Sequence, residues 1–179
     1  MTLSPPSPQN LTGNTNAWKP CAMPPTNNVT RLLDAKQIHY GAHELPNEKL
    51  GGVEAAAHLG VPAEQVFKTI VALPDSGKAV LALLPAPATL DLKLLARALS
   101  VGKVKVSSQA QAEELTGLQT GGISPLALIG KGFRVVLDQS AQSHALIYIS
   151  GGQRGLNLSL SPANLAALTG ARFARLSAG

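Results

Sequence analysis

Hydrophobic residues recur along the chain with two periods, one typical of helices and the other of strands. Where apolar residues return every three or four positions, one face of a helix is expected to be buried. This period predicts five short helices, at residues 29–36, 53–59, 92–99, 108–115 and 162–168. Alternating or continuous apolar runs between turn-forming residues predict eight strands, at 38–45, 67–73, 78–84, 103–106, 133–137, 146–150, 156–160 and 172–176.

The order of these elements indicates the fold class. Helices and strands are intermixed, and turn residues alone separate 67–73 from 78–84 and 146–150 from 156–160. Strand pairs this close in sequence are expected to form hairpins. Long helices do not alternate with the strands, as they would in a parallel βαβ fold. The pattern therefore predicts an α+β domain around a mostly antiparallel or mixed sheet.

The first 26 residues differ from the rest. They hold six of the 13 prolines, many Ser, Thr and Asn residues, and Lys19 as their one charged residue. Such a segment buries too little apolar surface to offset the entropy of ordering it. We expect a disordered extension at 1–26, in which Trp18 is the residue able to dock, and one folded domain at 27–179.

Composition narrows the class of protein. Aromatic residues make up 3% of the 179 residues, so the core must be aliphatic. No apolar run is long enough to span a membrane and the N-terminus lacks a signal-peptide pattern, so a cytoplasmic location is expected. Cys21 is the sole cysteine, which excludes a disulfide framework and a multi-cysteine zinc site. The net charge of +5 favours an anionic partner such as nucleic acid, although it is scattered along the sequence and also fits a merely basic protein.

Lys68 stands out within the strand expected at 67–73. Ile70 and Ala72 share its face, and both faces of this strand are largely apolar. An unpaired ammonium is costly to bury. Lys68 must therefore reach solvent with its stem buried, pair with another group, or line a pocket.

The loop at 120–126 is the second candidate. Gly121 and Gly122 permit backbone conformations closed to other residues, and Pro125 removes an N–H donor. Without side chains in the way, their N–H groups could bind an anion or a developing oxyanion. The alternative is a tight turn between a helix and a strand.

A second glycine turn lies at 150–155. Its main chain could hold a phosphate, and Arg154 at its tip could reach one. The turn lacks the Gly-Lys-Ser/Thr ending of a P-loop, so a purely structural hairpin remains the alternative.

Other catalytic arrangements are missing from the sequence. Ser124 is not in a Gly-x-Ser-x-Gly elbow, and none of the four histidines shows metal-ligand spacing. The ten carboxylates form no evident acid and base pair. We therefore expect no metal and no cofactor, and an enzyme here would use few side chains as proton carriers.

Four motifs, taken together, resemble those of the YbaK/EbsC family of trans-editing aminoacyl-tRNA deacylases, which are related to the editing domain of bacterial prolyl-tRNA synthetases. The motifs are Phe-Lys-Thr at 67–69, Leu-Asp-Leu-Lys at 90–93, Thr-Gly-Gly-Ile-Ser-Pro-Leu at 120–126 and Tyr-Ile-Ser-Gly-Gly-Gln-Arg-Gly-Leu at 148–156. The resemblance extends from about residue 27 to the C-terminus. One departure is that Glu44 and Leu45 follow His43, where family members often carry a tyrosine.

The resemblance implies a compact α+β fold with a central mixed, barrel-like sheet surrounded by short helices. It implies a mischarged tRNA(Pro) as substrate, in particular Cys-tRNA(Pro), with prolyl-tRNA synthetase as a candidate partner. The catalytic group would consist of Lys68, Gly121, Gly122 and Ile123, with the loop amides near the scissile carbonyl. The substrate's own thiol would attack its ester, and the cysteine would be released as a cyclic thiolactone. The substrate-binding residues would be Thr69, Ser124, Pro125, Ser150, Gly151, Gly152 and Arg154.

Two alternatives stay open. The same chemistry could act on another aminoacyl group, such as Ala-tRNA(Pro). The chain could instead be a non-catalytic module that binds tRNA or protein through its basic surface, although pure binding does not require an oxyanion pocket.

Overall fold

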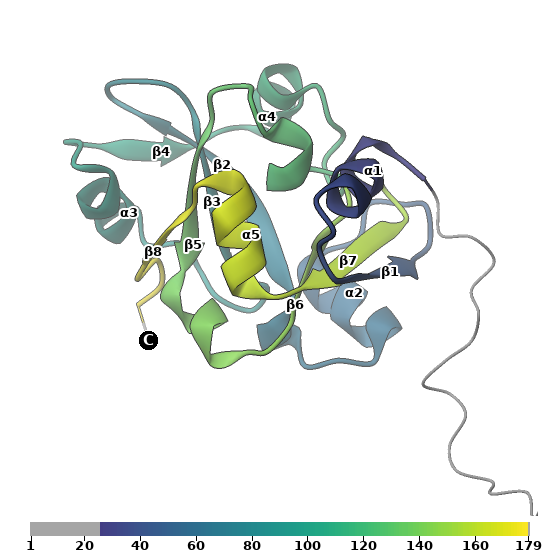
Figure 1. Ribbon diagram of the computed structural model, residues 1–179. Coiled ribbons are helices and arrows are strands. Elements are labelled where there is room, and N and C mark those ends of the chain that lie inside the picture. The colour runs from purple at the N-terminus through teal and green to yellow at the C-terminus, as the bar shows by residue number, and fades with distance from the viewer. Residues whose placement is uncertain (1–25, 179) are drawn as a thin grey trace, which may run out of the picture.

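The computed structural model describes residues 26–178, and the expectations for the extension and for Trp18 lie outside this range. Within it, five α-helices of eight residues each are interspersed with eight strands (Figure 1). The helices are α1 Asn28–Ala35, α2 Gly52–Leu59, α3 Leu92–Leu99, α4 Gln109–Thr116 and α5 Pro162–Thr169. The strands are β1 Tyr40–Glu44, β2 Phe67–Pro74, β3 Val80–Pro85, β4 Val104–Val106, β5 Arg134–Asp138, β6 Ile147–Ser150, β7 Leu156–Leu160 and β8 Arg172–Ala174.

The helix ends follow from local chemistry. Asn27, Asp91 and Ser108 cap the first turns of α1, α3 and α4 by accepting hydrogen bonds from main-chain N–H groups. Gly60 and Gly117 end α2 and α4 in the left-handed conformation that a glycine adopts without strain. None of these helices is long and apolar enough to cross a membrane.

The strands form two sheets rather than the one barrel-like sheet expected. β1, β7 and β6 make an antiparallel sheet, while β4-β2-β3-β5-β8 is the order of a mixed sheet. Both predicted hairpins are present, but β5 runs parallel to β3 and to β8. A single bridge, Val66 with Tyr148, links the sheets. The barrel expectation is wrong because β2 and β6, which run parallel at this bridge, form no further ladder pair, so the two sheets stay separate within the described residues.

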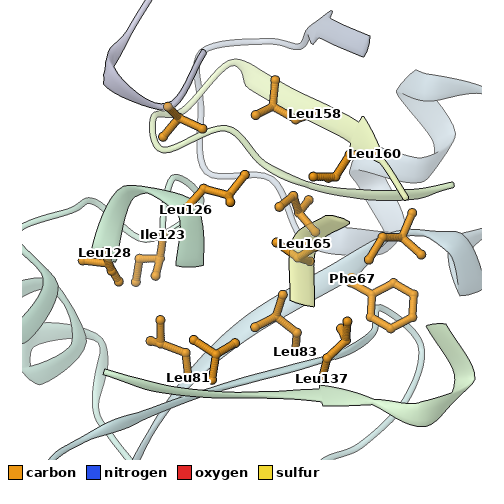
Figure 2. Packing of buried hydrophobic residues seen from close by; sticks show 14 of the residues in the cluster. Phe67, Leu81, Leu83, Ile123, Leu126, Leu128, Leu137, Leu158, Leu160 and Leu165 are labelled. Carbon is orange, nitrogen blue, oxygen red and sulfur yellow. The ribbon is translucent and has the colours of Figure 1, made fainter. Parts of the chain in front are cut away.

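The main core lies between the two sheets and is aliphatic, as expected. Leu81 and Leu83 of β3 face Leu158 and Leu160 of β7, and Leu165 of α5 fills the space between them (Figure 2). Alternate β3 residues point to the other side of the sheet. There Val80 and Ala82 pack with Val136 under α3, through Leu95 and Leu99.

Candidate active site

A cavity of about 490 Å³ opens where the two sheets meet. Four segments supply its walls: the loop and first turn of α2 within 45–55, the start of β2 within 66–69, the loop within 120–123, and the β6–β7 hairpin within 150–157. Of the residues predicted from the sequence, five line this cavity: Lys68, Thr69, Gly121, Ile123 and Ser150. Six others lie outside its lining: Gly122, Ser124, Pro125, Gly151, Gly152 and Arg154.

Lys68 is fixed at the start of β2. Its Nζ donates to the carbonyl oxygens of Ala86, at 3.0 Å, and Ala88, at 2.5 Å. Burial lowers the pKa of Lys68 below its ordinary value. An ammonium group has three N–H donors, so one remains for a ligand in the cavity. Of the three outcomes that the sequence left open, Lys68 both pairs with neighbouring groups and lines a pocket.

Two charged side chains hold Thr120 from opposite sides. The Glu113 carboxylate, on α4, accepts a hydrogen bond from the Thr120 amide at 2.9 Å. Arg154 Nε donates a hydrogen bond to the Thr120 carbonyl at 2.8 Å. The hydrogen bond from Thr120 lowers the pKa of Glu113, and the Arg154 charge acts in the same direction. We call these three residues the Thr120 bracket. Arg154 thus holds the glycine loop through Nε, and its predicted contact with a phosphate stays a prediction.

The next two peptides are held as well. The Gly122 amide donates to the Gln119 carbonyl at 2.8 Å, and Ser150 Oγ donates to the Gly121 carbonyl at 3.4 Å. A Cβ on Gly122 would come within 2.9 Å of the main chain at Gln153, so only glycine fits there. The loop therefore packs directly on the β6–β7 hairpin.

This geometry divides the loop amides into two kinds. The Gly122 amide is occupied within the loop, whereas no residue among 26–178 accepts the amides of Gly121 or Ile123. Both of these residues line the cavity. The donors available to a ligand are thus the Gly121 and Ile123 amides rather than a continuous run.

The remaining predicted residues have structural contacts. Ser124 is fully buried, and its Oγ accepts the Leu126 amide at the start of the 3-10 helix Pro125–Leu128. The Gly151 amide pairs with Leu156 across the hairpin, and Gly152 packs against α1 with a φ of +94°. Their roles toward substrate stay predictions.

Asn157 is a cavity residue that the sequence reasoning missed. It lies between His43 and Ser150 in the small sheet and is 6% exposed. Its Oδ1 is buried without a hydrogen-bond partner within the described chain. The alternation of leucines with polar residues across 156–160 was the available signal, because it puts Asn157 and Ser159 together on the face away from the core.

His43 also belongs to this polar face. Its Nε2 lies 3.0 Å from Ser159 Oγ, and its ring packs against Tyr148 with centroids 5.4 Å apart. Burial lowers the pKa of His43, which favours the neutral ring near pH 7. In residues 26–178, no three His, Cys, Asp or Glu side chains converge to hold a metal ion.

The fold and the cavity together define a protein suited to binding an acyl group. One small cavity is lined by a half-buried ammonium and by two residues whose amides have no acceptor within residues 26–178, an arrangement able to stabilise negative charge on a carbonyl oxygen. The family model for the aminoacyl-tRNA editing domain matches residues 47–168. The chain belongs to this family of editing deacylases, the YbaK/EbsC family, as its motifs predicted.

Individual relatives agree with this assignment. The chain is 31% identical over 151 residues to an Enterococcus faecalis protein provisionally named Cys-tRNA(Pro)/Cys-tRNA(Cys) deacylase EbsC, a match covering 83% of this chain and 92% of that protein. The crystal structure of a hypothetical protein aligns with a TM-score of 0.78 at 26% identity, covering 85% of this chain and all of that one. The crystal structure of a provisionally assigned trans-editing enzyme for prolyl-tRNA synthetase aligns with a TM-score of 0.70 at 26% identity, covering 86% of this chain and 99% of that one.

Proposed function

We propose that this chain removes cysteine from mischarged Cys-tRNA(Pro). The observation that carries the proposal is that Gly121 and Ile123, whose amides have no acceptor within residues 26–178, line the same cavity as Lys68. The name of the Enterococcus relative supports the choice of cysteine.

In the proposed reaction the substrate supplies its own nucleophile. The cysteine sulfur bonds to the ester carbonyl carbon, and the Gly121 and Ile123 amides stabilise the oxyanion that forms. The bond from this carbon to the ribose oxygen then breaks. The thiol proton passes to the ribose oxygen, leaving a cyclic thiolactone and an intact tRNA. Loss of one donor of this kind typically costs about 3 kcal/mol in the transition state.

Lys68 acts on the leaving side in this proposal. Its third N–H is directed by the two carbonyls that hold the other donors, and it stabilises the ribose alkoxide as the ester breaks. A lowered pKa also suits Lys68 to relay the thiol proton, because it can give one proton to the ribose oxygen and regain one from the thiol. Thr69 and Ser150 complete the wall around the aminoacyl group.

A panel of aminoacyl-tRNAs tests the proposal. The purified chain is mixed with Cys-tRNA(Pro), Ala-tRNA(Pro), Ser-tRNA(Pro) and Cys-tRNA(Cys), and loss of the ester is followed over time. We expect rapid loss of cysteine and slow loss of alanine and serine. An S-alkylated cysteine should stay attached, because its sulfur can no longer attack. Equal rates for alanine and cysteine would contradict thiol assistance, and inactivity toward the whole panel would refute the proposed function.

We further propose that the protein works in the cytoplasm, where prolyl-tRNA synthetase produces the mischarged substrate. Adding the synthetase at a fixed substrate concentration is expected to raise the editing rate if the two proteins exchange tRNA directly. An unchanged rate would argue that the substrate is captured from solution.

A further inference from the structure

Exposed basic side chains gather at the end of the five-stranded sheet away from Lys68. They come from strand ends, turns and the last turn of α3, and each one is exposed. We call this group the basic end: Lys78, Arg97, Lys103, Lys105, Lys131, Arg134 and Arg172.

The strand register brings these segments together. Val106, Ala72, Val80 and Arg134 form one row across β4, β2, β3 and β5. This row is four residues along β2 from Lys68, or about 13 Å at the rise of an extended strand. The other basic residues lie on segments next to this row, or on the turns that continue from it away from Lys68. In Figure 1 α3, β4 and β8 accordingly lie on the side opposite to α2 and β1.

Charge at the basic end is poorly balanced. Segments 74–80, 97–106, 131–134 and 172 hold seven Lys and Arg residues but a single carboxylate, Asp75. That carboxylate already accepts the Lys103 main-chain amide at 3.0 Å. The other described residues hold seven basic and nine acidic side chains. The excess positive charge of the described chain is thus confined to this end.

Two of the arginines are held in place. Arg134 Nη1 donates to the Leu99 carbonyl at 3.5 Å, and Arg172 Nη1 donates to the Ala98 carbonyl at 3.1 Å. These carbonyls end α3, where the helix dipole is negative. Both arginines line a hollow of about 270 Å³. A guanidinium carries five N–H donors, so each retains donors for an anion.

The surface suits a phosphate backbone better than exposed bases. Its nearby aromatic residues, Phe133 and Phe173, are only partly exposed and pack against the core. Recognition of single-stranded nucleic acid usually relies on exposed aromatic rings that stack on bases. Double-stranded RNA is recognised mainly through its shape, its phosphates and its 2′-hydroxyls.

We propose that the basic end binds phosphates in the double-helical acceptor stem of the tRNA whose 3′ end enters the cavity, an inference that rests on the proposed function. The ester lies at the tip of a short single-stranded tail, and the stem begins where that tail ends. Contacts at the basic end would therefore hold the stem while the tail reaches the cavity.

Salt-dependent binding tests this surface without requiring turnover. Uncharged tRNA(Pro) transcript is titrated with the full chain at several salt concentrations. The double variants are Lys103→Gln with Lys105→Gln, and Arg134→Gln with Arg172→Gln. The matched control is Arg31→Gln on α1 with Lys36→Gln at its C-cap, which removes the same charge elsewhere. The lysine pair has no side-chain hydrogen bond within residues 26–178, so the fold should tolerate it.

We expect each basic-end pair to weaken binding several-fold and to reduce the slope of log affinity against log salt by about two. The control pair should leave the slope unchanged. Equal losses in all three variants, or no loss in the basic-end pairs, would overturn the assignment; the second outcome would direct attention to an acidic protein partner.

Activity separates this inference from the proposed function. Cysteinyl ester on a short single-stranded 3′ fragment should be cleaved equally by the wild type and the basic-end variants, whereas KM for whole tRNA should rise in the variants. Wild-type values for whole tRNA in the variants would refute the docking surface alone. A wild type that binds tRNA through this end but cleaves no ester would refute the proposed function alone.

Discussion

The two ends of β2 present different chemistry to a ligand. At the Lys68 end, polar groups are partly buried and held by specific hydrogen bonds, as the Thr120 bracket shows. At the other end, charges are exposed and most have no side-chain partner in the part of the chain that the structure describes. Ligand binding at the cavity therefore depends mainly on the positions of hydrogen-bonding groups, whereas binding at the basic end depends mainly on long-range electrostatic attraction. The contrast suggests that catalysis and tRNA capture can be disturbed independently.

The largest expected effect comes from Lys68→Ala. Removing the ammonium should lower kcat for Cys-tRNA(Pro) by about 100-fold or more, the range found for one lost oxyanion donor. Single-turnover deacylation measures this change directly. The comparison variant is Lys103→Ala at the basic end, which should alter KM but leave kcat intact. Equal kcat losses in the two variants would remove the distinction between the ends.

Gly122→Ala should have the next largest effect. The new Cβ would meet the main chain of Gln153 at 2.9 Å, and neither segment can move without displacing the loop amides. We expect a destabilisation of about 1–3 kcal/mol for such overpacking. Misplaced donors should also lower kcat by between about 10- and 100-fold. Thermal unfolding and deacylation rates give the two values.

Gly60→Ala serves as the control for that variant. Gly60 has a positive φ of +68°, unlike Gly122, and an added Cβ there meets nothing within 4 Å. The substitution should cost stability of about 1 kcal/mol through backbone strain while leaving the deacylation rate unchanged. If Gly60→Ala lowered activity as much as Gly122→Ala, loss of stability rather than loop geometry would explain both.

Much of the local structure was predictable because its causes are local. Helix caps at Asn27 and Asp91, and the hairpin of β2 with β3, depend on residues close in sequence. Lys68 was identifiable for the same reason, since a lone ammonium on an apolar strand face is visible without any partner. The parallel pairing of β5 with β3 could not be predicted, because parallel neighbours are not joined by a short turn.

Features made by distant residues could not be predicted. The basic end combines side chains from Lys78 to Arg172, so its charges look scattered along the sequence. Arg154 reaches Thr120 across 34 positions, and this support for the loop could not be read from the sequence, whereas a contact of Arg154 with phosphate stays a prediction. The cavity wall contributed by 45–55 carries no motif that points to it.

Glu113→Ala tests the Thr120 bracket with a smaller expected effect. Losing one hydrogen bond to the Thr120 amide should lower kcat by about three- to tenfold at unchanged KM, as expected for a typical net hydrogen-bond energy. Glu113→Gln keeps an acceptor and should recover most of the rate. Glu114→Ala, the exposed neighbour on α4, is the control and should resemble the wild type. A higher KM with unchanged kcat would instead favour direct contact with substrate.

The pH dependence of the bracket has a definite sign. The pKa of Glu113 is lower in the folded protein than its ordinary value. The stabilisation that the ionised carboxylate gives the folded state is therefore fully present above the ordinary glutamate pKa, and it is lost as pH falls through the lowered value. The Thr120 amide resonance in ¹H–¹⁵N NMR spectra should shift across that acidic range. The shift should be absent in Glu113→Gln, and its persistence there would show that another group titrates.

Asn157→Ala should give the smallest change, and stability and binding should respond differently. Its Oδ1 is buried without a partner in residues 26–178, so removing it relieves an unsatisfied acceptor and should leave the unfolding temperature nearly unchanged. If this oxygen accepts a donor from the aminoacyl group, KM should rise by about threefold, the lower part of the range for one hydrogen bond. Ser159→Ala, on the same face but outside the cavity lining, is the control and should leave KM unchanged. An unfolding temperature that falls while KM stays constant would assign Asn157 a structural role, leaving recognition of the aminoacyl group to the loop amides and Lys68.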